Sequence, residues 1–295
     1  MFRADVLAAA LAVACHAARA AAPALPNQEP ARQAAAPASA AVVSSARHER
    51  AETSEQPPTR RVSGAGSASC PPEMARIERP QGGYCIDRWE ASLARRTAAG
   101  ALEPWPSNRS VDDLASEFVA ISANGQRPQG YVSGRQAARA CANAGKRLCA
   151  MDEWVRACRG AEGRKYPYGD VRRAGACNDR FKVDGDHPVV TLFRMVEPPG
   201  ADRARMWLPS FMNDPRLHEL PRTVEPTGSF AECRSEHEVY DLVGNLHEWI
   251  DDPEGTFVGG FFMDTYQNGE GCSYRTRAHD FEYHDYSTGF RCCLG

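Results

Sequence analysis

No apolar run in this sequence is long enough to cross a membrane as a helix. The most apolar stretch, Val6–Ala14, has about nine residues, whereas a membrane-spanning helix needs about 20. Arg3 precedes this stretch and Ala18–Ala20 offers a small-x-small cleavage site, as in an export signal. We therefore predict a signal peptide over 1–20 and an exported protein, periplasmic or extracellular. Ala12–Cys15 resembles a lipobox without its leucine, so a lipid anchor on Cys15 is the less favoured alternative.

The sequence also lacks an excess of charge of either sign. Lys and Arg total 35, Asp and Glu total 38, and the formal net charge is -3 at pH 7. Charges of both signs are interspersed, which argues against a nucleic-acid partner and against a polybasic membrane anchor. The partner classes that remain are a protein and a small ligand.

Several short motifs of common enzyme classes are missing as well. The sequence has no Walker loop, no dinucleotide-binding fingerprint, no nucleophile elbow and no internal repeat. It also has no CxxC pair, which disfavours a zinc site. Nucleotide-dependent and serine-hydrolase chemistry are therefore not predicted.

Large apolar side chains are nearly absent from residues 21–69, which are mainly Ala, Pro, Ser, Arg and Glu. Such a segment cannot bury enough apolar surface to offset its chain entropy, so we predict a disordered linker. From Cys70 onward, aromatic residues, cysteines and short apolar runs continue to the last residue. One domain over 70–295 is the simplest prediction.

Cysteine, by contrast, is abundant. The sequence has 11 cysteines, and removal of the signal peptide with Cys15 leaves an even ten. In an exported chain an even set predicts disulfides, because an oxidising compartment leaves few thiols free. The ten predicted disulfide cysteines are Cys70, Cys85, Cys141, Cys149, Cys158, Cys177, Cys233, Cys272, Cys292 and Cys293.

Helix signals are few. Ser133 is a suitable N-cap for one helix, which Gly145 would end, and a second helix is predicted over Met151–Arg159. Trp154 and Cys158 are four residues apart, so they share one face of the second helix, and we expect that face to point into the core.

The rest of the domain is predicted to form short strands separated by turns that contain Gly, Pro, Asn and Asp. Examples are Glu248–Ile250 and Thr256–Val258. This pattern predicts a loop-rich α+β domain with little regular secondary structure. We expect Trp89, Trp154 and Trp249 in its core.

Four stretches, in order and spacing, resemble the formylglycine-generating enzyme, or sulfatase-modifying factor, domain. The resemblance covers essentially all of 70–295. The stretches are Cys70–Met74 with Tyr84–Glu90; Ala144–Leu148 with Glu153–Trp154, Arg159–Gly160 and Tyr166–Gly169; Val239–Trp249; and Gly259–Gly260 with Gly289–Cys292. The resemblance implies a C-type-lectin-like fold held by calcium and disulfides. Enzymes of this family oxidise a cysteine of unfolded sulfatases to formylglycine, using molecular oxygen and copper bound by two cysteines.

The copper-binding cysteines of those enzymes correspond here to Asp264 and Gly269, and a neighbouring serine corresponds to Phe261. A carboxylate and a glycine cannot replace the two soft thiolates that hold Cu(I). The resemblance with this departure implies a binding or accessory module, and no copper is expected. Cys272 is an alternative thiol, and using it would make the chain a divergent oxidoreductase of the family. A disulfide for Cys272 is preferred because it keeps the cysteine count even.

The resemblance also implies a calcium site in the segment Asp241–Glu248. Its ligands would be the side chains of Asp241 and Glu248 and the backbone carbonyls of Gly244 and Leu246. Such oxygen ligands suit a hard cation. The alternative is a plain turn that enters a strand, with both carboxylates solvated. Asn178 matches part of a second calcium site of the family, for which no ligand set is predicted.

The resemblance further implies two disulfides, Cys141 with Cys292 and Cys158 with the region of Cys272. Proximity or elimination leaves Cys70 with Cys85, Cys177 with Cys233, and Cys149 with Cys293.

Two polar segments allow further hypotheses. A non-haem iron site would draw on two imidazoles and a carboxylate, but a polar loop with turn-forming side chains is preferred. The candidate iron ligands are His247, His279, Asp280, Glu282, His284 and Asp285. The second segment is either a recognition groove or a packed hairpin. Its residues are Phe261, Phe262, Asp264, Tyr266, Asn268 and Glu270.

Overall fold

The computed structural model describes residues 69–80, 82–111, 117–179 and 187–295. The chain divides into two units, 1–62 and 63–295, and all described residues belong to the second. The predicted signal peptide at 1–20, with Cys15, and the predicted linker up to residue 68 lie outside the described residues, so both stay predictions.

Three small sheets organise the described residues. The first has the strand order β1-β2-β11-β6 and the second has the order β10-β7-β8-β9. In the third, β3 lies between β4 and β5. The strands are β1 (Met74–Ile77), β2 (Tyr84–Asp87), β3 (Ala91–Arg96), β4 (Leu102–Pro104), β5 (Phe118–Ser122), β6 (Arg147–Leu148), β7 (His247–Trp249), β8 (Phe257–Val258), β9 (Arg275–Thr276), β10 (Thr288–Phe290) and β11 (Cys292–Leu294).

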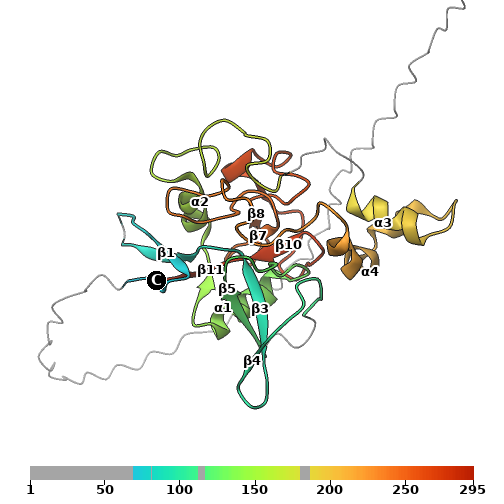
Figure 1. Ribbon diagram of the computed structural model, residues 1–295, viewed down its shortest axis with the longest axis horizontal. Coiled ribbons are helices and arrows are strands. Elements are labelled where there is room, and N and C mark those ends of the chain that lie inside the picture. The colour runs from blue at the N-terminus through green and yellow to red at the C-terminus, as the bar shows by residue number, and fades with distance from the viewer. Residues whose placement is uncertain (1–68, 81, 112–116, 180–186) are drawn as a thin grey trace, which may run out of the picture. The chain divides into compact units, whose positions relative to one another are not determined.

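The pairing brings the end of the chain to its middle. β10 pairs with β7 in parallel, whereas β11 is antiparallel to both β2 and β6. The consecutive strands β10 and β11 therefore belong to two different sheets, and Arg291 is the single residue that links the two strands. In Figure 1, β7, β8 and β10 lie in the middle of this unit, beside β11.

Both predicted helices are confirmed. α1 (Gly134–Asn143) begins after Ser133, whose side chain accepts from the N–H of Gln136 in a capping box. α2 (Met151–Arg159) ends at Gly160. Trp154 and Cys158 are both fully buried in the core, as their shared face predicts.

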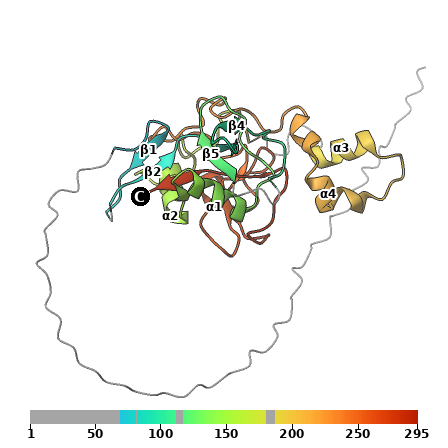
Figure 2. The ribbon, with the colours of Figure 1, turned by 90° about the horizontal axis from the view of Figure 1, so that it is seen from below.

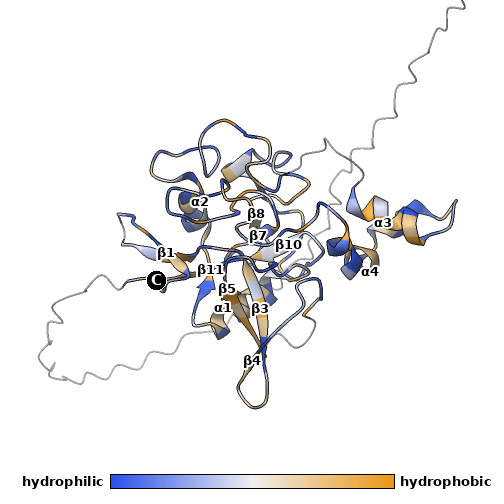
Figure 3. Cartoon of the chain, in the orientation of Figure 1, coloured by the Kyte–Doolittle hydropathy of each residue, from blue (hydrophilic) through white to orange (hydrophobic). Residues whose placement is uncertain are grey.

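The expectation that only strand-like pieces remain is wrong for residues 188–212. This segment forms α3 (Pro188–Val196) and α4 (Pro209–Met212), with a 3-10 turn at Arg203–Trp207 between them, and a second 3-10 turn follows at Pro215–Glu219. β-branched residues at the start of α3 favour a strand locally, but Pro188 occupies its first turn and His187 caps it. Figure 2 shows α3 and α4 side by side, and Figure 3 shows the apolar residues of α3 in orange.

The apolar core has three clusters. One surrounds Trp154 and Tyr84, a second surrounds Trp249 and Phe118, and the third joins α3 to Tyr131 and Tyr286. Trp89 is a correction to the sequence prediction, because it is only partly buried and stacks on Tyr240 at a ring distance of 6.1 Å.

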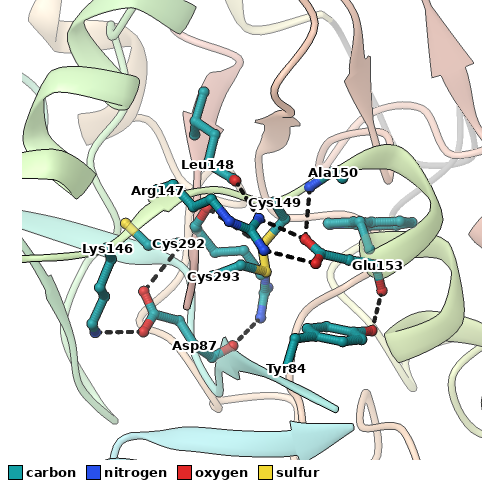
Figure 4. The surroundings of a disulfide bond; sticks show 12 residues. Tyr84, Asp87, Lys146, Arg147, Leu148, Cys149, Ala150, Glu153, Cys292 and Cys293 are labelled. Carbon is teal, nitrogen blue, oxygen red and sulfur yellow. Dashed lines mark hydrogen bonds and ion pairs between the residues drawn. A yellow bond between two sulfur atoms is a disulfide. The ribbon is translucent and has the colours of Figure 1, made fainter. Parts of the chain in front are cut away.

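Five disulfides join the ten cysteines of the described residues. The pairs are Cys70–Cys85, Cys141–Cys292, Cys149–Cys293, Cys158–Cys272 and Cys177–Cys233. They coincide with the pairs expected from the resemblance and from elimination. Figure 4 shows Cys149–Cys293 with two ion pairs nearby, Lys146–Asp87 and Arg147–Glu153.

The disulfides indicate the kind of compartment in which the protein folds. Five disulfides are typical of proteins that fold in an oxidising, exported environment. In the part of the chain that the structure describes, no helix combines the length and apolar character needed to cross a membrane.

Candidate functional site

A buried ion pair joins the last residue of the segment predicted to bind calcium, Glu248, to Arg291. Glu248 lies in β7, and both of its carboxylate oxygens accept bonds of 2.6 Å from the guanidinium of Arg291. The indole N–H of Trp154 donates a third bond, of 2.7 Å, to Glu248 Oε2. Arg291 is 0% exposed and Glu248 is 1% exposed. The pair is bidentate and screened from water, which makes each of its hydrogen bonds strong.

Arg291 also binds backbone oxygens on both sides of this pair. Its guanidinium donates to the carbonyl of Asp87 at 3.0 Å and to that of Tyr240 at 2.8 Å. A buried guanidinium must satisfy its donors inside the protein, and here they connect β2, the loop before β7 and β7 itself. The Gly-Phe-Arg-Cys stretch therefore contributes a buried charge as well as a strand.

Two further buried carboxylates lie close to this pair. Glu90 accepts bonds from Asn245 Nδ2 at 2.5 Å and from the backbone N–H of Leu246 at 3.1 Å. Asp241 accepts from the N–H of Gly228 at 2.7 Å. Burial raises the pKa of Glu90 well above its ordinary value, and the nearby charges of Asp241 and Glu248 raise it further. Burial likewise raises the pKa of Asp241.

These charges do not balance. When ionised, Glu90, Asp241 and Glu248 carry three negative charges against the one positive charge of Arg291, which leaves a net charge of −2 in the interior. Unpaired buried charge is costly, so this region favours either protonation or a divalent cation.

The donors fit a hard cation such as calcium in type and in charge. Glu248 has about four lone-pair sites, and its bonds to Arg291 and Trp154 occupy three of them. The other two ligands in the set that the resemblance implies are the backbone carbonyls of Gly244 and Leu246. Among the described residues, no three His, Cys, Asp or Glu side chains come together to hold a metal.

The backbone before β7 is held in an unusual conformation. Asp241, Gly244 and Asn245 have φ angles of 58, 84 and 57°, a left-handed region that non-glycine residues rarely adopt. A Cβ at Gly244 would lie 2.2 Å from the carbonyl oxygen of Asn178. The Asp241–Glu248 segment therefore folds tightly over Asn178, and Gly244 is required for this contact.

The segment predicted as a groove or a hairpin contains a tight turn. Phe261 and Asp264 exchange backbone hydrogen bonds of 2.9 and 3.0 Å. Asp264 Oδ1 accepts from the N–H groups of Tyr266 and Gln267. Phe262 and Asp264 are buried, whereas Tyr266 is 58% exposed. The carboxylate of Asp264 therefore mainly binds backbone N–H groups of its own turn. Tyr266 and Asn268 are solvent-exposed residues of this segment.

A hydrogen-bonded chain of side chains runs beneath this turn. His247 contacts the hydroxyl of Ser287 through Nδ1 at 3.2 Å and the hydroxyl of Tyr274 through Nε2 at 3.3 Å. Ser287 in turn donates to Asp285 at 2.7 Å. His284 instead contacts Asn213. Among the residues that the structure describes, the candidate iron ligands form no group of three that could hold a metal.

The chain matches a family model over most of its described residues. The model is that of the sulfatase-modifying factor enzyme 1-like domain, and it matches residues 97–293, well over half of the 295 residues. The chain belongs to this family. Membership confirms the resemblance and the predicted C-type-lectin-like, loop-rich α+β fold.

Two other comparisons add little to the family match. The crystal structure of CarF is similar to this chain with a TM-score of 0.39 and 17% sequence identity, and the match covers 72% of this chain and 86% of that one. No curated protein matches the chain significantly.

The sequence resemblance assigns two positions of this chain to the copper-binding cysteines of the family. Asp264 and Gly269 stand there, and Asp264 caps the turn that follows it. The nearest cysteine in sequence, Cys272, is 1% exposed and forms a disulfide with Cys158 in α2.

Sequence reasoning missed Arg291, the partner of Glu248, and Glu90, a carboxylate close to the pair. Glu90 and Arg291 both lie in stretches that carry the family resemblance, but neither was assigned to the site. A charged residue in an otherwise apolar motif, as Arg291 is between Phe290 and Cys292, is the signal that could have indicated a buried ion pair.

Proposed function

We propose that this sulfatase-modifying factor family member is an exported, calcium-stabilised binding or accessory module that does not carry out copper-dependent oxidation. The observation that carries the proposal is the state of the cysteines: two family copper positions hold Asp264 and Gly269, and Cys272 is bonded to Cys158. Cu(I) sites of this kind need free thiolates. The surface that Tyr266 and Asn268 present is the candidate recognition site for a protein or a small ligand.

Export is supported by the N-terminal sequence pattern and by the disulfide framework. The apolar stretch with its small-x-small site is typical of a signal peptide. Five disulfides would not persist in a reducing compartment.

The calcium part of the proposal rests on donor chemistry and charge. Asp241 and Glu248 would hold the ion with the carbonyls of Gly244 and Leu246. Calcium favours several oxygen ligands of this kind, and its two charges would neutralise the surplus of the buried carboxylates. Its role would be to hold the Asp241–Glu248 segment against the rest of the domain.

A thiol count and a metal analysis of the purified, exported chain test this proposal. We expect no reactive thiol in the native or in the denatured, unreduced protein, and calcium without copper or iron. Stoichiometric copper together with a titratable thiol at Cys272 would instead establish a divergent oxidoreductase, the alternative function. Stoichiometric iron would contradict the proposal in the same way.

A further inference from the structure

Tyr286 connects the body of the domain to a helical lobe, which we define as residues 187–220. Each polar group of Tyr286 binds the lobe. Its N–H donates to the carbonyl of Met212 at 3.1 Å, its hydroxyl contacts His187 Nε2 at 3.1 Å, and its carbonyl accepts from His218 Nε2. Two of these three connections pass through a histidine. The attachment of the lobe is therefore sensitive to the protonation state of its histidines.

His187 uses both ring nitrogens in its neutral form. Its Nδ1 accepts from the N–H of Val189 and so caps α3. Because Nδ1 accepts, the single proton of the neutral ring is on Nε2, which donates to Tyr286. A second proton would convert Nδ1 to a donor, remove the cap of α3 and place a positive charge at the start of a helix, where it is unfavourable. Burial lowers the pKa of His187 to about 4.

His218 is also held in its neutral form. The ring is 5% exposed and lies at 4.6 Å from the ring of Tyr131. Burial lowers the pKa of His218 to about 4, and the positive charge of Arg127 lowers it further, although the bond to Tyr286 opposes the shift. A cavity of about 440 Å³ lined by His218, Arg127 and Glu219 lies beside the ring.

Among the residues that the structure describes, Asp285 and Asp214 are carboxylates near this junction. Asp285, next to Tyr286, is fully buried, and it accepts from Tyr283 and Ser287 on the body side. Asp214 on the lobe pairs with Arg216, and its backbone carbonyl accepts from the hydroxyl of Tyr131. Burial is the cause that lowers the pKa of His187.

The lobe covers apolar surface of the body. Phe262, Leu246 and Tyr131 are each at most 1% exposed and pack in one cluster with Val189, Leu192 and Leu217 of the lobe. Phe261 borders the same cluster. Movement of the lobe would therefore uncover an apolar surface next to the turn at 261–264.

We propose that the lobe is an acid-released lid: a second proton on His187 removes the cap of α3, and the charge that protonation places on His187 and on the buried ring of His218 is favoured only when water reaches both rings, which frees the lobe from the apolar surface around Phe262. At neutral pH both rings are neutral and the lid is closed. At acidic pH the released histidines take up protons that the closed state excludes, and the open state is stabilised. This inference is independent of whether the domain binds calcium.

Hydrogen exchange of the whole exported chain tests the lid. The amides of α3 should lose protection between pH 7.5 and pH 5, after correction for the intrinsic exchange rate, whereas those of α1 should not. In the open state each histidine should have an ordinary pKa of about 6.5. Each one should therefore raise the equilibrium constant for opening of the lobe roughly 10- to 30-fold at pH 5.

Variants separate the lid from general acid destabilisation. His187→Asn retains an N-cap for α3 but cannot titrate, and with His218→Gln it should abolish the pH dependence. His237→Asn changes a histidine that faces Glu236 and should behave as the parent protein. Equal α3 protection at both pH values in the parent, or an unchanged pH dependence in the double variant, would overturn the proposal.

If the lobe of the double variant is already open at pH 7.5, the variant cannot show a pH dependence, and the parent protein then provides the test. There, the ring resonances of His187 and His218 should titrate together with the loss of α3 protection. Titration of both rings without any change in α3 would contradict the lid.

Discussion

At the scale of single residues, Arg291 shows what a buried charge does in this domain. It is 0% exposed, and its bonds to Glu248 and to two carbonyls connect three segments that are far apart in the sequence. Removing one partner of such a pair leaves the other buried and unpaired, which costs more than the pair itself contributes. Arg291 is therefore a residue that the fold needs.

Replacing this arginine should be strongly destabilising. We expect Arg291→Met to lower the free energy of unfolding by about 3–5 kcal/mol, because Glu248 then lies unpaired in the interior. Denaturant unfolding measures the change. Arg164→Met removes an exposed ion pair to Glu162 and should leave the midpoint unchanged within error; a similar loss in both variants would show that burial is not the cause.

Calcium should stabilise the parent protein through Glu248. At about 100 times the dissociation constant, calcium contributes about 2.7 kcal/mol, a rise of roughly 5–10 °C in Tm for a domain of this size. Glu248→Gln keeps the shape but removes the charge, so its Tm should rise far less on calcium addition. Differential scanning calorimetry with and without a chelator measures both values.

Glu153→Gln is the matched control for that experiment. Glu153 is also 1% exposed and also pairs with an arginine, Arg147, but it lies in α2. This variant should melt at a lower temperature than the parent and still gain the full calcium shift. Equal calcium shifts in the parent and in Glu248→Gln would remove the calcium part of the proposal.

At the scale of elements, the segment that enters β7 depends on close backbone contact. Gly244 lies at φ 84°, and a Cβ there would approach the carbonyl oxygen of Asn178 to 2.2 Å. Gly163 has a similar φ of 71° but faces open space. The two glycines therefore separate the cost of the left-handed conformation from the cost of a clash.

Alanine at these two glycines should have unequal effects. Gly163→Ala should cost about 1–2 kcal/mol, the usual penalty for a left-handed residue with a Cβ. Gly244→Ala should cost about 1–3 kcal/mol more, because backbone must move to relieve the overlap. Urea unfolding of both variants measures the difference, and equal costs would contradict the tight packing over Asn178.

At the scale of the whole domain, disulfides hold together parts that are distant in the sequence. Cys141–Cys292 closes a separation of 151 residues, and Cys70–Cys85 closes only 15. On the chain-entropy model a longer closed loop restricts the unfolded chain more, so these two disulfides should contribute about 5 and about 3 kcal/mol.

Paired serine variants compare the two disulfides. We expect the Cys141→Ser/Cys292→Ser protein to unfold at lower denaturant concentration than the Cys70→Ser/Cys85→Ser protein. Both should remain less stable than the parent. The reverse order would show that local strain or solvation, and not the length of the closed loop, determines their contributions.

Short-range patterns in the sequence determined much of this protein. Ser133 and Gly160 predicted the limits of two helices, and the even number of cysteines predicted a fully bonded set, because capping and oxidation depend on residue type and local order. The order of four motifs indicated the family. That Asp264 and Gly269 replace the copper thiolates stays a prediction. The strand-like start of α3 misled the prediction, because Pro188, the His187 cap and packing against Tyr131 outweigh local propensity there.

Tertiary structure alone decided which charges meet. Glu90, Asp241, Glu248 and Arg291 come from positions spread over two hundred residues of sequence, and only the pairing of β10 with β7 and of β11 with β2 brings them together. The same holds for His187 and His218, which meet Tyr286 across the lobe. Burial determines the pKa of such groups, and tertiary contacts determine the partners that they bind. Both depend on the packing of the whole domain.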